Sequence, residues 1–267
     1  MSDFFAAADQ AWLWLGGSFL LAVVWSNVAE LFRKGRLGRV GDALSRITTW
    51  SYAPWLLQFL RLLYYVGLPY AALLLGRDAL SERFLGLMTQ SALPPADVWR
   101  DWATDAGWTV ALGAAAWLLL ALGWTTVRRS LTTGEARADR QTTVPSPSGF
   151  ILLREAIYHE VHWAFYRNAP LVAMQSILGA PYWGVWIGLT LVAAEAGLNP
   201  AWREGITSPH RAPSLWMRAA LALVSSVLFL QTQNLWLAIL IHWAVSWGLV
   251  VWMRAFPPQS TVTHPLQ

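Results

Sequence analysis

The segment Leu235–Met253 has the sequence LWLAILIHWAVSWGLVVWM and contains no Asp, Glu, Lys or Arg. A helix that crosses the hydrocarbon core of a membrane needs about 20 mostly apolar residues. The segment therefore predicts a transmembrane helix. Segments of the same kind recur along the chain, so we expect an all-α fold: a polytopic helical membrane protein with about seven transmembrane helices.

Seven membrane spans are predicted from the distribution of apolar residues. They cover Ala11–Leu31, Tyr52–Leu75, Gly107–Val127, Phe150–Ile177, Tyr182–Ala196, Leu215–Leu230 and Leu235–Met253. Gly179 and Pro181 are expected to separate the fourth span from the fifth, because both residue types interrupt helices. The acidic segment 78–106 is expected to be a loop that holds a short amphipathic helix near Phe84–Met88.

The predicted spans divide the chain into four parts. Residues 1–130 form the N-terminal transmembrane helices and residues 131–149 a cytoplasmic linker. Residues 150–256 form a transmembrane core that carries most of the polar residues found within spans, and residues 257–267 form a tail.

Composition supports the membrane assignment. Of the 267 residues, 56% are hydrophobic and only 13% are charged, about half of the roughly 25% charge that is usual in soluble domains. The absence of Cys excludes disulfide scaffolds and cysteine-ligated metal sites.

The net charge of +4 describes topology and gives no reason to expect a nucleic-acid partner. With seven spans, the basic loops 32–51, 128–149 and 197–214 and the residue Arg254 all fall on one side of the membrane. Basic loops mark the cytoplasmic side. We therefore expect an integral protein of a bacterial plasma membrane, with the lipid bilayer as a partner and the C-terminus in the cytoplasm.

Most of the ionisable residues within the predicted spans lie in residues 154–168, REAIYHEVHWAFYRN. An ionisable residue inside a membrane is costly and marks a functional site by default. At about 100° per residue, two neighbouring faces of this helix are polar. The first face holds Glu155, His159, His162 and Tyr166, and the second holds Glu160, Trp163 and Arg167. The second face predicts a carboxylate–guanidinium pair between Glu160 and Arg167. An alternative interpretation for Arg154 and Glu155 is that they lie in water at the membrane surface and have no functional role.

Other polar residues stand alone in apolar spans. His242 and Ser246 are four residues apart and share one face of the last span. Instead of a functional role, His242 can be a packed, hydrogen-bonded core residue. Glu195 can likewise be an acid at the membrane surface. Arg61 is expected to be structural, either reaching the surface or pairing with a buried acid. Asn234 is expected to cap the last helix.

A metal site is an alternative interpretation of the same residues. Four side chains could surround a divalent metal if their two helices face each other: Glu155, His159, His162 and His242. The sequence His159-Glu160-Val161-His162 does not have the H-E-x-x-H spacing of zinc peptidases, because Trp163 occupies the position of the second His. No other cofactor is expected.

The polar clusters, taken in order, resemble those of the CPBP intramembrane endopeptidases, also called the Abi or CAAX-protease and bacteriocin-processing family. The first motif of that family is Glu-Glu-x-x-x-Arg, and Phe165-Tyr166-Arg167-Asn168 is similar to its ending. The third motif is His-x-x-x-Asn or Asp, which the segment from His242 to Ser246 resembles. The resemblance covers about residues 148–256.

Four positions depart from the family pattern. Alignment on Arg167 places His162 and Trp163 at the two Glu positions of the first motif. Glu195 stands where the second motif has His, and Ser246 replaces the final Asn or Asp. Three explanations are open: Glu and His have exchanged helices, the first-motif Glu has moved to Glu160, or catalysis has been lost.

The resemblance implies a peptidase that cleaves a peptide or membrane-protein substrate within the membrane. Glu160 or Glu195 would activate a water molecule. His162 and His242 would orient that water or stabilise the oxyanion, with Ser246 as an additional donor. Arg167 would hold a carboxylate in place.

Two other functions fit the sequence. A catalytically inactive relative would keep the helices and act as a membrane binding or scaffold protein. A metal-dependent membrane enzyme or transporter would use the Glu and His set named above.

Overall fold

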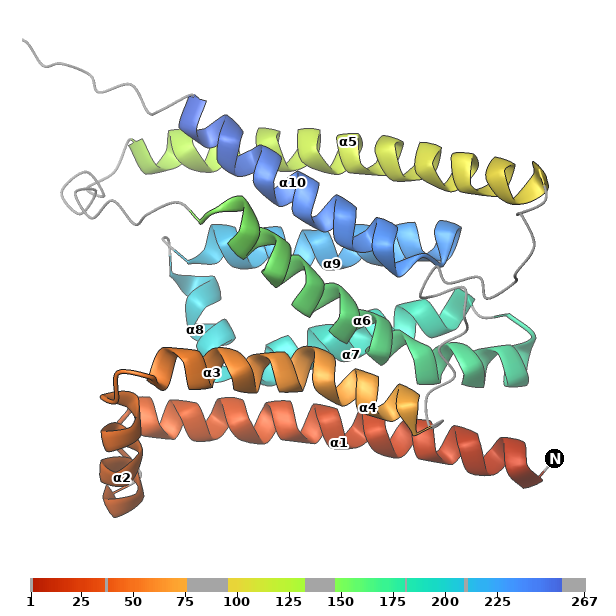
Figure 1. Cartoon of the computed structure of the whole chain (residues 1–267). Helices are drawn as coiled ribbons and strands as arrows, with labels where there is room; N and C mark the ends of the chain where they lie inside the picture. Colours follow the sequence, from red (N-terminus) through yellow and green to blue (C-terminus); the bar gives the residue numbers. More distant parts are fainter. Residues whose placement is uncertain are drawn as a thin grey trace, which may run out of the picture.

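The structure is a computed structural model that describes residues 2–36, 38–75, 96–132, 147–180, 182–208 and 211–255. All regular secondary structure in these residues is helical (Figure 1). In chain order the elements are α1 (Ser2–Arg33), α2 (Gly38–Thr48), α3 (Ala53–Leu62), η1 (Leu63–Gly67), α4 (Leu68–Leu74), α5 (Ala96–Thr132), α6 (Gly149–Leu178), α7 (Tyr182–Leu198), α8 (Pro200–Thr207), α9 (Ala212–Thr232) and α10 (Leu235–Ala255).

Among the described residues, five helical segments are long and apolar enough to cross a membrane. They are Ala11–Arg33, Ala53–Leu74, Trp102–Thr126, Ala212–Thr232 and Leu235–Ala255. The helical membrane fold is therefore confirmed, whereas the expected number of seven spans is not. The two remaining segments are helices, but α6 is rich in polar residues and α7 has only 17 residues.

The distribution of polar and apolar side chains is that of a membrane protein. Large apolar side chains cover the outside of the bundle, among them Leu13, Trp55 and Leu119. Charged and polar side chains such as Glu160 and Arg167 lie fully inside. Hydrocarbon cannot hydrogen-bond, so polar groups are stable only where other protein groups satisfy them.

Several boundaries differ from the predicted ones. Residues 96–106 were expected in a loop but form the first turns of α5. Helices α2 and α8 lie in segments that were expected to be loops. The predicted helix near Phe84–Met88 lies outside the described residues.

The second span contains a π-helical turn, η1, between α3 and α4. Its backbone makes a wide hydrogen bond from the Leu68 N–H to the Leu63 carbonyl. Pro69 follows directly and has no N–H for the helical ladder, so the wide turn accommodates it without ending the span. Such turns are frequent at functional sites, and this one carries Tyr64 and Tyr65.

Helix α6 is central and packs against α7, α10, α1 and η1 (Figure 1). Ser148 caps its start by accepting a hydrogen bond from the Ile151 N–H. Gly179, in the left-handed conformation at φ 65°, ends it, as the sequence predicted.

Helices α6 and α7 approach each other closely. A Cβ atom added to Gly184 would lie 2.5 Å from the Leu171 backbone, and one added to Gly188 would lie 2.8 Å from the Arg167 Cα atom. Small residues four apart are a common interface between membrane helices because they let backbones touch. This contact sets the position of α7, and with it Glu195, relative to α6.

Candidate functional site

Glu160 is the centre of a closed polar network. Its exposed fraction is 0%. One carboxylate oxygen, Oε1, lies 2.9 Å from His242 Nδ1, and the other, Oε2, accepts a hydrogen bond from the Ser225 hydroxyl. Helices α6, α9 and α10 are therefore joined at one buried carboxylate.

Arg167 belongs to this network but does not contact Glu160 directly. Its guanidinium donates to the Ser225 hydroxyl at 3.0 Å and to the Ser226 hydroxyl at 3.2 Å. The predicted link between Glu160 and Arg167 is therefore indirect, because the Ser225 hydroxyl of α9 lies between the two charged groups. Arg167 also packs over the Phe229 ring, with the guanidinium carbon 5.4 Å from the ring centroid.

His162 and Glu195 form a second pair, between α6 and α7. The distance from His162 Nε2 to Glu195 Oε2 is 3.1 Å. The His162 side chain is 4% exposed and that of Glu195 is 22% exposed. His162 Nδ1 is buried and has no hydrogen-bond partner in the part of the chain that the structure describes. The pair joins α6 to α7.

Aromatic rings connect the two pairs. The His159 ring centroid lies 5.7 Å from that of His242 and 6.0 Å from that of Tyr65. Tyr65 in turn lies 5.1 Å from His162. His159 is fixed by a 2.7 Å hydrogen bond between its Nδ1 and the Glu155 carbonyl. The histidines of α6 and α10 therefore belong to one continuous cluster, in which His242 contacts Glu160 and His162 contacts Glu195.

Arg61 pairs with Glu155, as the sequence allowed. Its two terminal nitrogens lie 3.1 and 2.6 Å from the two carboxylate oxygens, and Arg154 adds a contact of 3.0 Å. The Arg61 guanidinium also lies over the Tyr158 ring, 5.4 Å from its centroid. Glu155 is thus neutralised by two cations and ties α3 to the start of α6.

The four residues considered for a metal do not form a metal site. Among the described residues, no group of three or more His, Asp or Glu side chains lies close enough to hold an ion. Glu155 is engaged by Arg61 and Arg154, and the His159 ring is turned to its own backbone. The geometry therefore gives the metal hypothesis no support.

Ser246 is buried one turn beyond His242 on α10. Its hydroxyl makes no hydrogen bond to the pairs above within the described residues. Asn234 caps α10 as predicted, since its side-chain oxygen accepts from the backbone N–H groups of Trp236 and Leu237.

Sequence reasoning missed four residues of the cluster. Ser225 and Ser226 stand in an apolar span, where a serine pair at the middle of α9 is the only signal of a polar contact. Tyr64 and Tyr65 were placed in the second predicted span, Tyr52–Leu75, and given no role. The nearby Pro69 is the signal that the helix is irregular there.

Comparisons with known proteins find no relatives. No model of a known protein family matches the chain, and neither the curated proteins nor the solved structures contain a match.

Proposed function

We propose that the protein is an intramembrane peptidase of the CPBP type that hydrolyses a peptide bond of a membrane-associated substrate. The observation that carries the proposal is the His162–Glu195 pair: a carboxylate with partial access, fixed at 3.1 Å by a buried imidazole whose other nitrogen has no partner among the described residues. A general base must lie within reach of the water that it activates, and the 22% exposure of the Glu195 side chain supports its assignment as this base.

The exchange of Glu and His between helices explains the departure from the family motifs. Glu195 on α7 takes the part of the first-motif Glu, and His162 on α6 takes the part of the second-motif His. The two side chains still meet, so the same pair is built from the opposite helices. Glu195 accepts the proton of the attacking water and later gives it to the leaving amine, while the water oxygen bonds to the carbonyl carbon.

Glu160 is assigned a bracing role, because both of its oxygens are already engaged and no part of it is exposed. It holds His242 through Nδ1. The Nε2 edge of His242 makes no hydrogen bond among the described residues and is assigned to the oxyanion, with Ser246 beside it. Arg167 is assigned to hold the Glu160 carboxylate in place through the Ser225 hydroxyl, which contacts both side chains.

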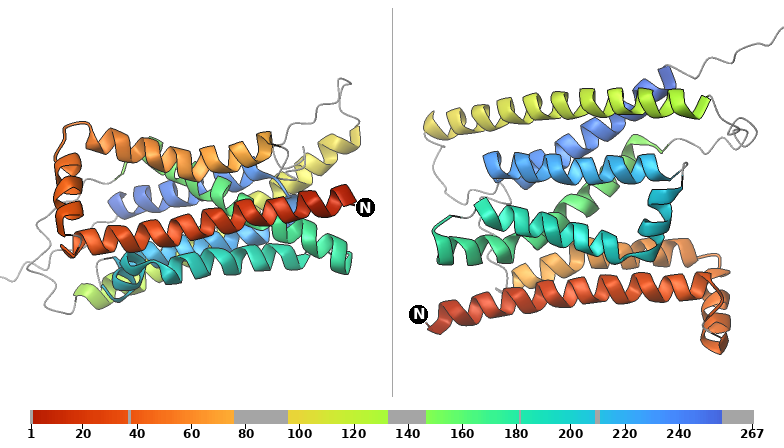
Figure 2. Two further views of the ribbon diagram at one scale, coloured as in Figure 1. Left: turned by 90° about the horizontal axis from the view of Figure 1, so that it is seen from below. Right: turned by 180° about the vertical axis from the view of Figure 1, so that it is seen from behind.

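The proposal includes seven spans. The helices α6 and α7 run between the same two ends of the bundle as the five apolar segments (Figures 1 and 2). Most polar side chains of α6 are buried by its neighbours, so its low hydropathy does not prevent it from crossing. The basic loops then face the cytoplasm of a bacterial cell.

The test is a comparison of the peptide fragments that the protein releases. Purified protein is reconstituted with a solubilised membrane-protein fraction, and new N-termini are identified by mass spectrometry. The wild type is expected to produce N-termini that Glu195→Gln and His162→Ala lack, since loss of a general base lowers a rate by about 10²–10⁴-fold. The matched control is Asp42→Asn, an exposed carboxylate on α2. Equal sets of N-termini from all four proteins would contradict the proposal.

A non-catalytic scaffold is the second candidate, favoured by the closed network around Glu160. If the protein is a scaffold, the Glu195→Gln variant should give the same N-termini as the wild type. Glu160→Ala should still destabilise the fold.

A further inference from the structure

Helix α2 lies across the ends of two candidate membrane spans. It joins α1, whose span ends at Arg33, to α3, whose span begins at Ala53. Figures 1 and 2 show α2 turned crosswise to both helices at one end of the bundle. Both candidate spans end at this level, and in a membrane this places α2 at the depth of the lipid headgroups.

The corner before α2 is built by the backbone. Gly35, at φ 67°, ends α1: its N–H donates to the Phe32 carbonyl, and the Arg36 N–H donates to the Leu31 carbonyl. This is the helix ending that a left-handed Gly produces. Gly38, at φ 51°, begins α2 in a second left-handed conformation. The two left-handed glycines therefore define where α1 ends and where α2 begins.

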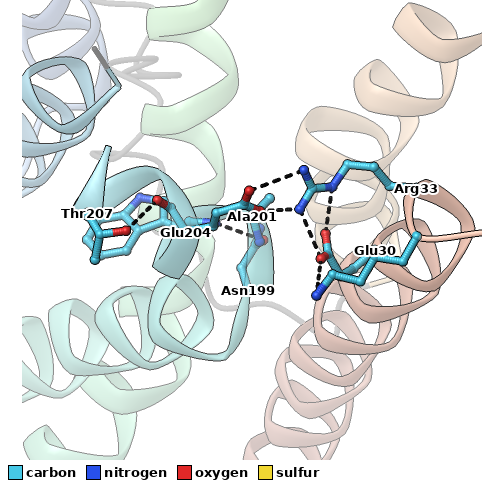
Figure 3. A network of polar contacts seen from close by, with 8 residues as sticks. Glu30, Arg33, Asn199, Ala201, Glu204 and Thr207 are labelled. Atoms are coloured by element: carbon cyan, nitrogen blue, oxygen red, sulfur yellow. Dashed lines mark hydrogen bonds and ion pairs between the residues drawn. The ribbon is translucent and has the colours of Figure 1, made fainter. Parts of the chain in front are cut away.

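A surface ion network holds the same corner (Figure 3). Glu30 accepts from Arg33 at 2.9 Å and from Lys34 at 2.8 Å, and Arg33 also pairs with Glu204 of α8. Arg33 and Lys34 are consequently neutralised within the protein.

The remaining basic residues of the corner are not neutralised. Arg36, Arg39 and Arg46 are exposed, and none has an ion-pair partner among the described residues. On the described part of α2 the single acid is Asp42. The free positive charge of this surface is therefore concentrated on these three arginines.

The apolar side of α2 is also exposed. At about 100° per residue, Val40, Leu44 and Ile47 fall on one face and Ser45 on the opposite one. Val40 is 62% exposed and Ile47 is 48% exposed. The exposed rings of Trp50 and Tyr52 follow directly and contact each other with centroids 5.3 Å apart. Trp and Tyr are enriched at membrane surfaces, and a short amphipathic helix with basic residues beside its apolar face is typical of segments that lie in the interface.

We propose that α2 is an interfacial helix that binds anionic phospholipid headgroups, with Val40, Leu44 and Ile47 in the acyl boundary and Arg36, Arg39 and Arg46 on the phosphates. Each cation near an anionic leaflet strengthens association about fivefold, so the three arginines together give a preference of up to about a hundredfold over neutral lipid. The proposal depends on membrane insertion and is independent of peptidase activity.

Depth is measured first, on the full chain in vesicles. The chain has no Cys, so a nitroxide attached at Ile47→Cys or Ser45→Cys has no background. In phosphatidylcholine vesicles with one-third phosphatidylglycerol, the label at position 47 is expected to be accessible to oxygen and that at position 45 to a water-soluble nickel chelate. Equal nickel access at both positions would overturn the proposal. Dipolar broadening between labels at position 47 would also overturn it, because a second copy of the chain would then cover this face.

Lipid choice is measured second, by native mass spectrometry with phosphatidylglycerol and phosphatidylcholine. The triple variant Arg36→Gln, Arg39→Gln, Arg46→Gln is expected to lose the preference for phosphatidylglycerol, whereas the control Arg203→Gln, Arg211→Gln keeps it. Retention of the preference in the triple variant contradicts the proposal. Displacement of the lipid by soluble glycerol phosphate at equal concentration also contradicts it, because the site would then recognise a free phosphate.

Discussion

At the scale of single residues, the buried carboxylate of Glu160 is expected to contribute strongly to the free energy of unfolding. Removal of one partner from a buried ion pair costs about 3–5 kcal/mol, because the other groups are left unpaired in a dry interior. We expect Glu160→Ala to lower the free energy of unfolding by this amount, since His242 and Ser225 lose their acceptor. Glu160→Gln should cost less, because its amide oxygen still accepts. Thermal unfolding of the purified protein in detergent measures both.

Glu204 provides the matched control for Glu160. Its side chain is 52% exposed, and an exposed ion pair contributes about 0–1 kcal/mol. If Glu160→Ala unfolds at the same temperature as Glu204→Ala, the network around Glu160 does not brace the bundle. A peptidase activity that survives in Glu160→Gln but not in Glu195→Gln separates the bracing residue from the catalytic one.

Residues of the buried cluster could be predicted from the sequence when they were ionisable. Glu160, His162, Arg167 and His242 could be selected because ionisable groups are rare in apolar helices, and all four are buried in the structure. Their partners could not be assigned from a helical wheel, which gives the faces of one helix and nothing about its neighbours. Neutral serines are ordinary in membrane helices, so Ser225 could not be recognised as the link between Glu160 and Arg167.

At the scale of elements, the contact between α6 and α7 predicts that Gly→Ala substitutions in α7 change the stability of the protein in a direction that depends on their position. Ala is a better helix former than Gly by about 1 kcal/mol. Gly184→Ala and Gly188→Ala should nevertheless destabilise the protein, because each new Cβ atom would overlap α6 backbone atoms at 2.5–2.8 Å. Gly197→Ala, in the same helix but with nothing within 4 Å, should be neutral or stabilising. Unfolding temperatures of the three variants test this.

The same three variants report on the candidate site. A shift of α7 away from α6 would separate Glu195 from His162, so fragment release should fall in Gly184→Ala and Gly188→Ala and stay unchanged in Gly197→Ala. Destabilisation by Gly197→Ala as large as that by Gly188→Ala would show that helix flexibility matters more than close packing.

Long apolar helices were predictable as elements, and irregular ones were not. Hydropathy locates both ends of α9 and α10 and the C-terminal end of α1 within a few residues, because an apolar span is visible in the sequence; the N-terminal end of α1 lies nine residues before the predicted Ala11. Helix α2 is short and amphipathic, and its start depends on two left-handed glycines, Gly35 and Gly38, whose conformation a hydropathy scan does not detect. The π turn η1 depends on Pro69 within a helix that otherwise continues.

At the scale of the whole molecule, the seven-span arrangement predicts which surfaces face each side of the membrane. The C-terminal ends of α1 and α10, which carry Arg33 and Arg254, lie at the end of the bundle that carries α2 and α8 (Figure 1), and basic segments stay on the cytoplasmic side. Single cysteines at Ser45, Ser148 and Ser208 should therefore be labelled by an impermeant maleimide only in inside-out vesicles. Cysteines at Ser176 and Gln231, at the other ends of α6 and α9, should be labelled only in right-side-out vesicles. All five positions are outside the buried core.

The comparison of Ser148 with Ser176 tests whether α6 crosses the membrane, because Ser148 precedes its first residue and Ser176 lies in its last turn. If α6 crosses the membrane, the two cysteines are labelled from opposite sides; if it lies on one surface, they are labelled from the same side and the chain has fewer spans. The second result would expose the Glu160 network to an aqueous face and remove the reason for a dry site. Denatured protein, in which every cysteine reacts, controls for differences in intrinsic reactivity. The Cys-free parent chain controls for non-specific label.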